Sequence, residues 1–352
     1  MRVVSVVGAR PQFVKLAPVA AALHTHGIDH IIVHTGQHYD ENMSGVFFED
    51  LAIPEPDVNL EVGSGSHGQQ TGEMLIGLDP VLQDAAPDWV LVYGDTNSTL
   101  AAAISAVKMH LPLAHLEAGL RSHNRRMPEE HNRVLTDHAA DLLLCPTELA
   151  HHNLIAEGLG DQSVVVGDVM TDICLKILAR ADSVALPASV PDSGFLLSTI
   201  HRAENTDDPA RLAAIVSGLQ QQPEPVVLTA HPRLLRKAAE AGYELNAGNV
   251  TAIEPLPYPQ MVKALAAASG VITDSGGLQK EAYLVGTPCT TLRTETEWQE
   301  TVAEGWNQLD PQLEHPKTWS WQAQVDSGAP RTSYGEGSAA DLVARELLKR
   351  VP

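Results

Sequence analysis

Three carboxylates in the first half of the chain have the residue types and positions that proton transfer requires. Asp95 and Glu117 each come at the end of an apolar run that predicts a buried strand, and Glu129 lies four residues before Arg133 in a predicted helix. Neighbouring carboxylates raise each other's pKa, so such a cluster can hold one protonated member and serve as an acid/base set without a metal. The alternatives are a simple i,i+4 ion pair of Glu129 with Arg133, and a metal site, which the accompanying arginines disfavour.

Cations and histidines follow other predicted strands. Arg10 and Lys15 come after the first strand, where a glycine turn leads into the N-terminus of a helix, a place that attracts anions. The turn lacks the GxGxxG pattern, so a dinucleotide fingerprint is absent. His201 and Arg202 follow a strand in the second half, and a second such pair, His231 and Arg233, follows the next strand. A histidine beside an arginine suits phosphate contact or proton transfer.

The segment from Thr273 to Glu281 is the strongest single motif. A strand ends there, the turn Ser275-Gly276-Gly277 exposes backbone N–H groups, and a helix begins. This pattern predicts a phosphate-binding turn, and Glu281, one turn into the helix, could accept hydrogen bonds from a ribose diol. A helix cap formed by Ser275 is the alternative, but it leaves the two consecutive glycines unexplained.

The elements that must position these residues alternate between short apolar runs and helical patterns. Such alternation predicts an α/β fold with an open parallel sheet in each half of the chain, and ligands of such sheets bind beyond the carboxyl ends of the strands. The predicted strands of the first half are Val3–Val7, His30–His34, Trp89–Tyr93, Leu113–Leu116, Leu142–Cys145 and Val164–Val166. Those of the second half are Phe195–Thr199, Val226–Thr229, Val250–Ile253, Gly270–Thr273 and Cys289–Leu292. The helices named on the same pattern are Pro11–Leu23, Ser98–Lys108, Ala210–Leu219, Tyr258–Ala268 and Leu278–Val285.

Composition limits the class of protein. The 352 residues include 44 acidic and 23 basic ones, a formal charge of 23 − 44 = −21, which argues against nucleic acid or an anionic membrane as the partner. No apolar run reaches the length of about 18 residues that a membrane helix needs, and the N-terminus predicts a strand and not a signal peptide. The 3 cysteines match no zinc or disulfide spacing. We therefore expect a cytoplasmic protein of about two domains.

Six motifs occur in order along most of the chain, and together they resemble the non-hydrolysing UDP-N-acetylglucosamine 2-epimerase family. The motifs are GARPQFVKLAP, GDTNST, HLEAGLRS, MPEEHNR, TIHRAEN and TDSGGLQKEA. The resemblance implies two Rossmann-like domains of the GT-B type with parallel sheets facing a central cleft. It implies an N-terminal domain of residues 1–168, on which a C-terminal helix of about 337–352 packs back, and a UDP-binding domain of residues 169–336.

The resemblance also implies an activity and a set of site residues. The family interconverts UDP-GlcNAc and UDP-ManNAc without a metal or other cofactor, by eliminating UDP to give 2-acetamidoglucal and adding it back, and its members are usually homodimers. The positions that match its catalytic residues are Asp95, Glu117, Glu129, Arg133 and His201. Those that match its UDP-binding residues are Arg10, Lys15, Ser275, Gly276, Gly277 and Glu281, and Arg202 could add charge at the departing phosphates.

The sequence departs from the family pattern in two places. Many members have Thr-Glu-Arg-Pro-Glu where this chain has Thr296-Glu297-Trp298-Gln299-Glu300, so Trp298 replaces an arginine, which marks a subtype and leaves the choice of UDP sugar open. Many bacterial members have Arg-Glu-Met where Tyr39 to Asn42 stand here. That region helps some members bind a second, activating UDP-GlcNAc, and we expect such activation to be weak or absent in this chain.

Three other functions compete with this prediction. A hydrolysing 2-epimerase would release ManNAc and UDP from the same intermediate. A second UDP sugar, such as a 2,3-diacetamido uronic acid, would favour an extra positive residue in the sugar pocket, and none is obvious in the sequence. A GT-B glycosyltransferase needs one base and not an acid/base cluster, which the set of Asp95, Glu117 and Glu129 disfavours.

Overall fold

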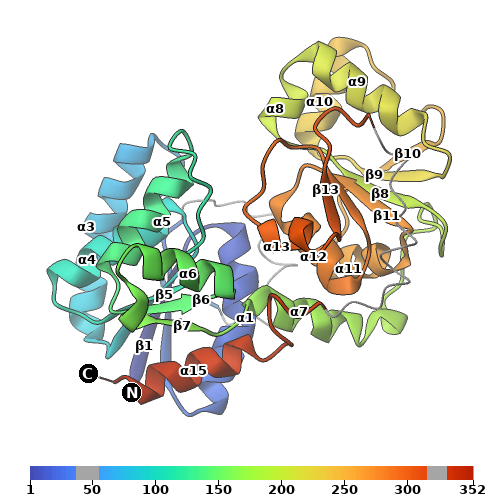
Figure 1. The fold of residues 1–352 in the computed structure, drawn as a ribbon. Helices are drawn as coiled ribbons and strands as arrows, with labels where there is room; N and C mark the ends of the chain where they lie inside the picture. The colour runs from blue at the N-terminus through green and yellow to red at the C-terminus, as the bar shows by residue number, and fades with distance from the viewer. Residues whose placement is uncertain (37–54, 315–330, 352) are drawn as a thin grey trace. The chain divides into compact units, whose positions relative to one another are not determined.

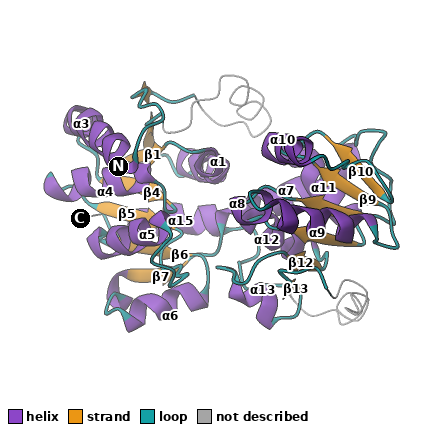
Figure 2. Ribbon diagram, turned by 90° about the horizontal axis from the view of Figure 1, so that it is seen from above, coloured by secondary structure: helices purple, strands orange, loops and turns teal. Residues whose placement is uncertain are grey.

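The computed structural model describes residues 1–36, 55–314 and 331–351 (Figure 1). The chain divides into two compact units. Unit 1 comprises Met1–Ile173 together with Thr332–Pro352, and unit 2 comprises Cys174–Arg331. Each unit is an α/β structure in which the strands lie between helices (Figure 2). The predicted fold class is therefore confirmed.

Unit 1 has a parallel seven-stranded sheet in the order β3-β2-β1-β4-β5-β6-β7. The chain builds outward from β1 in one direction and then returns to add β4 on its other side, so a switch point lies between β1 and β4. Ligands of open α/β sheets bind beyond the strand ends at such a point. The strands are β1 (Arg2–Val7), β2 (Asp29–His34), β3 (Val58–Asn59), β4 (Trp89–Tyr93), β5 (Leu113–Leu116), β6 (Leu142–Cys145) and β7 (Ser163–Val165).

The helices of unit 1 start at recognisable sequence signals. Thr96 caps one by accepting a hydrogen bond from the N–H of Thr99, and Pro128 opens another at its first position. The carboxylate of Asp172 accepts the N–H groups of Ala339 and Ala340 at 3.0 and 2.8 Å, which ties the last helix to this unit. The helices are α1 (Arg10–Thr25), α3 (His67–Ala85), α4 (Asn97–Lys108), α5 (Pro128–Ala139), α6 (Glu148–Ala156), α7 (Val169–Leu178), which continues into unit 2, and α15 (Ala339–Lys349), which packs against α1.

Unit 2 repeats the same topology with one strand fewer. Its parallel sheet has the order β10-β9-β8-β11-β12-β13, so the switch point lies between β8 and β11. The strands are β8 (Leu196–Thr199), β9 (Val226–Thr229), β10 (Val250–Ile253), β11 (Gly270–Thr273), β12 (Cys289–Thr291) and β13 (Asn307–Leu309). The helices are α8 (Ala203–Thr206), α9 (Pro209–Gln220), α10 (Pro232–Ala241), α11 (Tyr258–Ala267), α12 (Gly276–Val285) and α13 (Gln299–Ala303).

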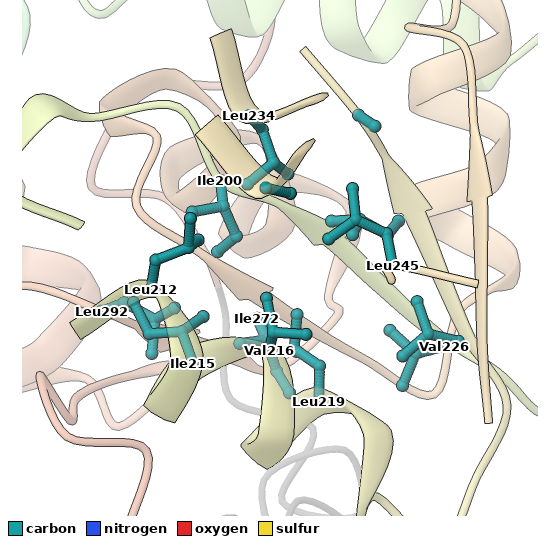
Figure 3. Close-up of a cluster of buried hydrophobic side chains, with 14 of the residues drawn as sticks. Ile200, Leu212, Ile215, Val216, Leu219, Val226, Leu234, Leu245, Ile272 and Leu292 are labelled. Atoms are coloured by element: carbon teal, nitrogen blue, oxygen red, sulfur yellow. The ribbon is translucent and has the colours of Figure 1, made fainter. Parts of the chain in front are cut away.

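The sheet of unit 2 is covered on both faces, which explains why its strands are apolar almost throughout. Leu196 and Leu228 point to one face, where α9 and α10 supply Leu212, Ile215 and other side chains (Figure 3). Leu197 belongs to the cluster on the opposite face, with side chains from α11 and α12. Successive residues of one strand thus enter the cores on opposite faces of the sheet, because side chains alternate between the two faces along a strand.

The predicted strands agree with the structure to within one residue at each end, and the short edge strands β3 and β13 were not predicted. Helix α10 was also missed, because His231 and the residues after it were interpreted as a functional pair. In the structure the ring Nδ1 of His231 accepts the N–H of Arg233 at 3.2 Å, and Arg233 pairs with Asp207, so both residues have structural roles there. Among the residues that the structure describes, no helix has the length and apolar character to cross a membrane.

Candidate active site

The switch point of unit 1 gathers the ends of β1, β4 and β5. Gln12 in the first turn of α1 joins the first two of these ends. Its side-chain oxygen accepts the N–H groups of Gly8 and Ala9 at 2.8 and 3.0 Å, and its Nε2 donates to the carbonyl of Tyr93 at 2.7 Å. The loops that follow β1 and β4 are therefore held together by one buried side chain.

Glu117 follows β5 directly and contacts Lys15 of α1, as an ion pair in which both side chains are nearly buried. Burial lowers the pKa of Lys15, but the charge and hydrogen bond of Glu117 outweigh it, so the pKa of Lys15 is raised. The ammonium group is thus held in its charged form beside the carboxylate. The backbone of Glu117 is left-handed, with a φ of 72°, and its N–H donates to the carbonyl of Leu144 on β6 at 3.1 Å.

Asp95 follows β4 and pairs with Arg133 of α5, with 2.6 Å between Oδ2 and Nη2. Arg133 is buried and also binds Glu130, with 2.8 Å between Nη1 and Oε2. Burial alone would raise the pKa of Glu130, but the N–H groups of Ser122 and His123 and the charge of Arg133 lower it. Glu130 therefore stays ionised and fixes the loop in front of α5.

The structure brings together most of the residues predicted for this part of the site, with one change of partner. Arg133 makes its i,i+3 pair with Glu130 rather than the i,i+4 pair considered for Glu129. Glu129 is exposed in the first turn of α5, and within the described part of the chain it takes part in no ion pair. The side chain of Arg10 and the segment from Tyr39 to Asn42 lie outside the described residues, so those two predictions stay predictions.

In unit 2 a buried carboxylate at the end of β11 organises the switch point. Asp274 is fully buried and accepts the N–H groups of His201 and Arg202 at 3.1 and 2.9 Å, and the side-chain amide of Asn205 at 3.0 Å. Its Oδ1 also lies 3.0 Å from Nδ1 of His201. Burial raises the pKa of Asp274, but these hydrogen bonds and His201 outweigh it and lower the pKa. The His201 ring is 42% exposed, so this contact leaves its Nε2 accessible.

The Ser-Gly-Gly turn opens α12, and its two glycines differ in their surroundings. Ser275 caps the helix through the N–H of Leu278 at 3.3 Å. A Cβ on Gly276 would come within 2.5 Å of a Glu297 carboxylate oxygen, whereas a Cβ on Gly277 would meet no atom within 4 Å. A side chain at position 276 would therefore displace the Glu297 carboxylate, whereas Gly277 leaves the helix N-terminus open to a ligand. Glu281, further along α12, is buried.

Trp298, the residue that departs from the family pattern, is buried beside this turn. The ammonium of Lys280 lies 4.2 Å from the centre of the Trp298 ring, a cation–π contact. Next to it, Arg293 and Glu297 form a buried pair with 2.9 Å between Nη2 and Oε2. Burial raises the pKa of Glu297, and the charge of Arg293 outweighs this and lowers it.

The sequence interpretation missed Asp274 and Glu130, the two buried carboxylates that hold the neighbouring loops. Both stood next to predicted residues, Ser275 and Glu129. For Asp274 the signal was available, because an acid placed directly after a buried strand needs hydrogen-bond donors there. For Glu130 the helical pattern could not show which of two adjacent glutamates turns inward.

Each unit has a parallel sheet between helices, with charged side chains at its switch point. Two units of this kind define a protein of the GT-B class. Its family follows from a wider comparison: the sequence profile of the UDP-N-acetylglucosamine 2-epimerase family matches residues 21–348. The chain belongs to this family and is an epimerase of it, which confirms the resemblance stated above.

Relatives and solved structures cover almost the whole chain. A UDP-2,3-diacetamido-2,3-dideoxy-D-glucuronate 2-epimerase of Pseudomonas aeruginosa is 46% identical over 99% of this chain and 100% of its own. The UDP-N-acetylglucosamine 2-epimerase of Methanocaldococcus jannaschii is 43% identical over 88% of each chain. The crystal structure of the M. jannaschii enzyme in complex with UDP-GlcNAc and UDP matches with a TM-score of 0.84 and 38% identity, covering 99% of this chain and 100% of that one.

Proposed function

We propose that the protein epimerises UDP-GlcNAc reversibly to UDP-ManNAc at C2, without net hydrolysis. Loss of the C2 proton and of UDP leaves the C1–C2 double bond of 2-acetamidoglucal. UDP then adds back at C1 while a proton reaches the opposite face of C2. The family match and the two M. jannaschii comparisons, an enzyme of that name and its complex with UDP-GlcNAc, support this choice.

The observation that carries the proposal is the pair of carboxylates at the ends of the neighbouring strands β4 and β5. Asp95 and Glu117 each contact a cation from a different helix, Arg133 and Lys15. In the proposal these carboxylates, with Glu129, take the C2 proton from one face and deliver a proton to the other. Lys15 and Arg133, which contact these carboxylates, can balance part of the charge that changes during proton transfer.

Unit 2 supplies the groups that hold the departing nucleotide in this proposal. The open N-terminus of α12 at Gly277, together with His201 and Arg202, would stabilise the growing negative charge on the diphosphate. Asp274 keeps the loop of His201 and Arg202 in place, because it accepts both of their backbone N–H groups. Glu281 would accept hydrogen bonds from the ribose hydroxyls of the nucleotide.

A second substrate is favoured by a specific observation. The P. aeruginosa relative, which acts on UDP-2,3-diacetamido-2,3-dideoxy-D-glucuronate by its name, is 46% identical to this chain over its entire length. The buried cation–π pair of Lys280 and Trp298 places a positive charge close to the Ser-Gly-Gly turn. An anionic sugar would gain from that charge, so the uronate is the alternative that the experiment must include.

The test is proton NMR of each UDP sugar with the purified protein in heavy water. A new H1 signal of UDP-ManNAc, with deuterium entering C2 of both epimers, is the expected result for UDP-GlcNAc. Free ManNAc and UDP would instead indicate a hydrolysing enzyme and overturn the proposal. Exchange only with the diacetamido uronate would transfer the assignment to that sugar, and no exchange with either would contradict the proposed reaction.

A further inference from the structure

A buried histidine lies two residues before Glu117, and both of its ring nitrogens are within hydrogen-bond distance of an oxygen atom. His115 on β5 is fully buried. Its Nδ1 lies 2.6 Å from Oδ1 of Asp137, and its Nε2 lies 2.7 Å from the carbonyl oxygen of Gly94.

Asp137 has further hydrogen-bond donors besides His115. The second oxygen of Asp137 accepts Nη1 of Arg121 at 2.7 Å and the N–H of Gly119 at 3.1 Å. Three donors surround this carboxylate, so its charged form is the one they stabilise. Burial would raise the pKa of Asp137, and His115 and Arg121 outweigh this and lower it. The ring of His115 therefore links this carboxylate to the carbonyl of Gly94.

Arg121, Glu157 and Cys145 complete the surroundings of Asp137. Arg121 also binds Glu157 of α6 through Nε and Nη2, at 2.7 and 2.8 Å, and Glu157 lies 3.2 Å from the exposed His138. Asp137 and the partly exposed Glu157 thus share the guanidinium of Arg121. On the remaining side, Cys145 of β6 faces Asp137, and burial followed by that charge raises the pKa of its thiol to about 12, so the thiol stays neutral.

This network touches the backbone on both sides of the proposed acid/base pair. Gly94, whose carbonyl accepts from His115, directly precedes Asp95. Gly119, whose N–H donates to Asp137, comes two residues after Glu117. An ideal Cβ on Gly119 would lie 2.2 Å from the carbonyl oxygen of Ala150 on α6, so the loop packs closely against that helix and has no room for a side chain there.

We propose that Asp137, acting through His115 and Arg121, is the positioning residue that sets Asp95 and Glu117 for proton transfer. The inference rests on the proposed function for its consequence in catalysis. The ionic network itself is a property of unit 1 and can be tested without turnover. Asp137 touches no substrate in this scheme; it holds the two loops from which the carboxylates project.

The first test is nitrogen-15 NMR of the histidine rings in the intact protein, with the His115 signal assigned by its loss in His115→Gln. We expect Asp137→Asn to shift the ring nitrogen signals of His115, because Nδ1 loses its contact with a carboxylate. Unchanged ring signals in that variant would overturn the link between His115 and Asp137, whatever reaction the protein catalyses.

The second test compares Asp137→Asn with a matched control, Asp141→Asn. Asp141 is an exposed aspartate after the same helix, and it accepts the N–H of Leu113 at the opposite end of β5 at 2.9 Å. Because a displacement of about 1 Å can cost about 100-fold in rate, we expect Asp137→Asn to lower kcat by about 10- to 100-fold with little change in KM, and Asp141→Asn to leave kcat unchanged. Equal kcat values in Asp137→Asn and the parent would refute the proposal.

Two further measurements cover the cases of a misfolded variant and an inactive parent. If Asp137→Asn does not fold, Arg121→Lys keeps the charge but cannot hold Asp137 and Glu157 together, and the same fall in kcat is expected. The nitrogen-15 signal of the Lys15 ammonium reports its contact with Glu117 without any substrate. We expect that signal to shift in either variant and not in Asp141→Asn; an unchanged signal would overturn the positioning role even if the proposed function fails.

Discussion

The two units have the same topology but hold their site residues in different ways. In unit 1 the two carboxylates that follow β4 and β5 are each matched by a cation from another element, Asp95 by Arg133 and Glu117 by Lys15. In unit 2 the buried Asp274 is satisfied mainly by backbone and amide N–H groups, and the open end of α12 consists of backbone amides. Side-chain pairs allow charge to change during a reaction, whereas fixed amides suit a group of constant charge such as a diphosphate.

Replacing Glu117 should have the largest effect, because it removes a proposed acid/base group from unit 1. Glu117→Gln should lower kcat by about 100- to 10,000-fold while the affinity for UDP, measured by calorimetry, stays within a factor of about three. Glu61→Gln is the matched control, since Glu61 is an exposed glutamate with a left-handed φ of 54° in the same unit. A variant at position 117 with near-parental kcat would remove the basis for assigning the chemistry to unit 1.

The adjacent residues Glu129 and Glu130 separate catalysis from stability within unit 1. Glu129→Gln should lower kcat by about 100-fold without changing the melting temperature, because the exposed carboxylate contributes no buried contact. Glu130→Gln should lower the free energy of unfolding by about 1 to 3 kcal/mol, because it disturbs a buried acceptor of two N–H groups and Arg133. Kinetics and thermal melts of both variants check the pair, and the reverse pattern would transfer the proposed catalytic role to Glu130.

The two glycines of the α12 turn test unit 2 in the same way. Gly277→Ala should weaken UDP binding at least about tenfold and yet raise stability by about 0.5 to 1 kcal/mol, since alanine is the better helix residue and has room there. Gly276→Ala should lower stability, because its Cβ would strike Glu297. Calorimetry with UDP and thermal melts distinguish these effects; unchanged UDP affinity in Gly277→Ala would mean that the phosphates bind elsewhere.

The pH dependence of stability should differ between the units. The pKa values of Asp137 and Asp274 are lowered by folding, so each contributes stability above the unfolded value of about 3.9 that is lost as the pH falls through the folded value. The pKa of Lys15 is raised, so its contribution is complete below about 10.4 and is lost as the pH rises through the folded value. Hydrogen exchange of peptides from each unit should show acid sensitivity in both and an alkaline loss around Lys15 in unit 1; a Lys15→Met variant that retains the alkaline loss would contradict this.

The smallest effect concerns one thiol in each unit. Burial raises the pKa of Cys145 and of Cys289 to about 12, so neither should react with iodoacetamide in the folded protein at neutral pH. Each thiol should become reactive only when its own unit unfolds, and mass spectrometry along a urea series would then report the two units separately. Rapid labelling without urea would show that the surrounding core opens locally.

Much of the frame could be predicted from the sequence, because buried parallel strands have a strong local signal. Trp89–Tyr93, Leu113–Leu116 and Val226–Thr229 are predicted at their observed bounds. The edge strand Asn307–Leu309 is short and polar at two positions, so it lacks that signal. The carboxylates Asp95 and Glu117 were found by their places after strands. The ion-pair partners of these carboxylates could not be predicted in the same way. The contact between Lys15 and Glu117, for example, depends on the strand order, which brings β1, β4 and β5 together.

The left-handed backbone at Glu117 has a consequence for how this protein can be improved. A residue with a side chain pays on the order of 1 to 2 kcal/mol for that conformation, a cost that glycine avoids. Glycine at position 117 would avoid that cost but would leave the ammonium of Lys15 without its carboxylate, and removing one partner of a buried pair costs about 3 to 5 kcal/mol. A screen for thermostable variants is therefore expected to retain Glu117 in spite of its strained backbone, even without an activity filter.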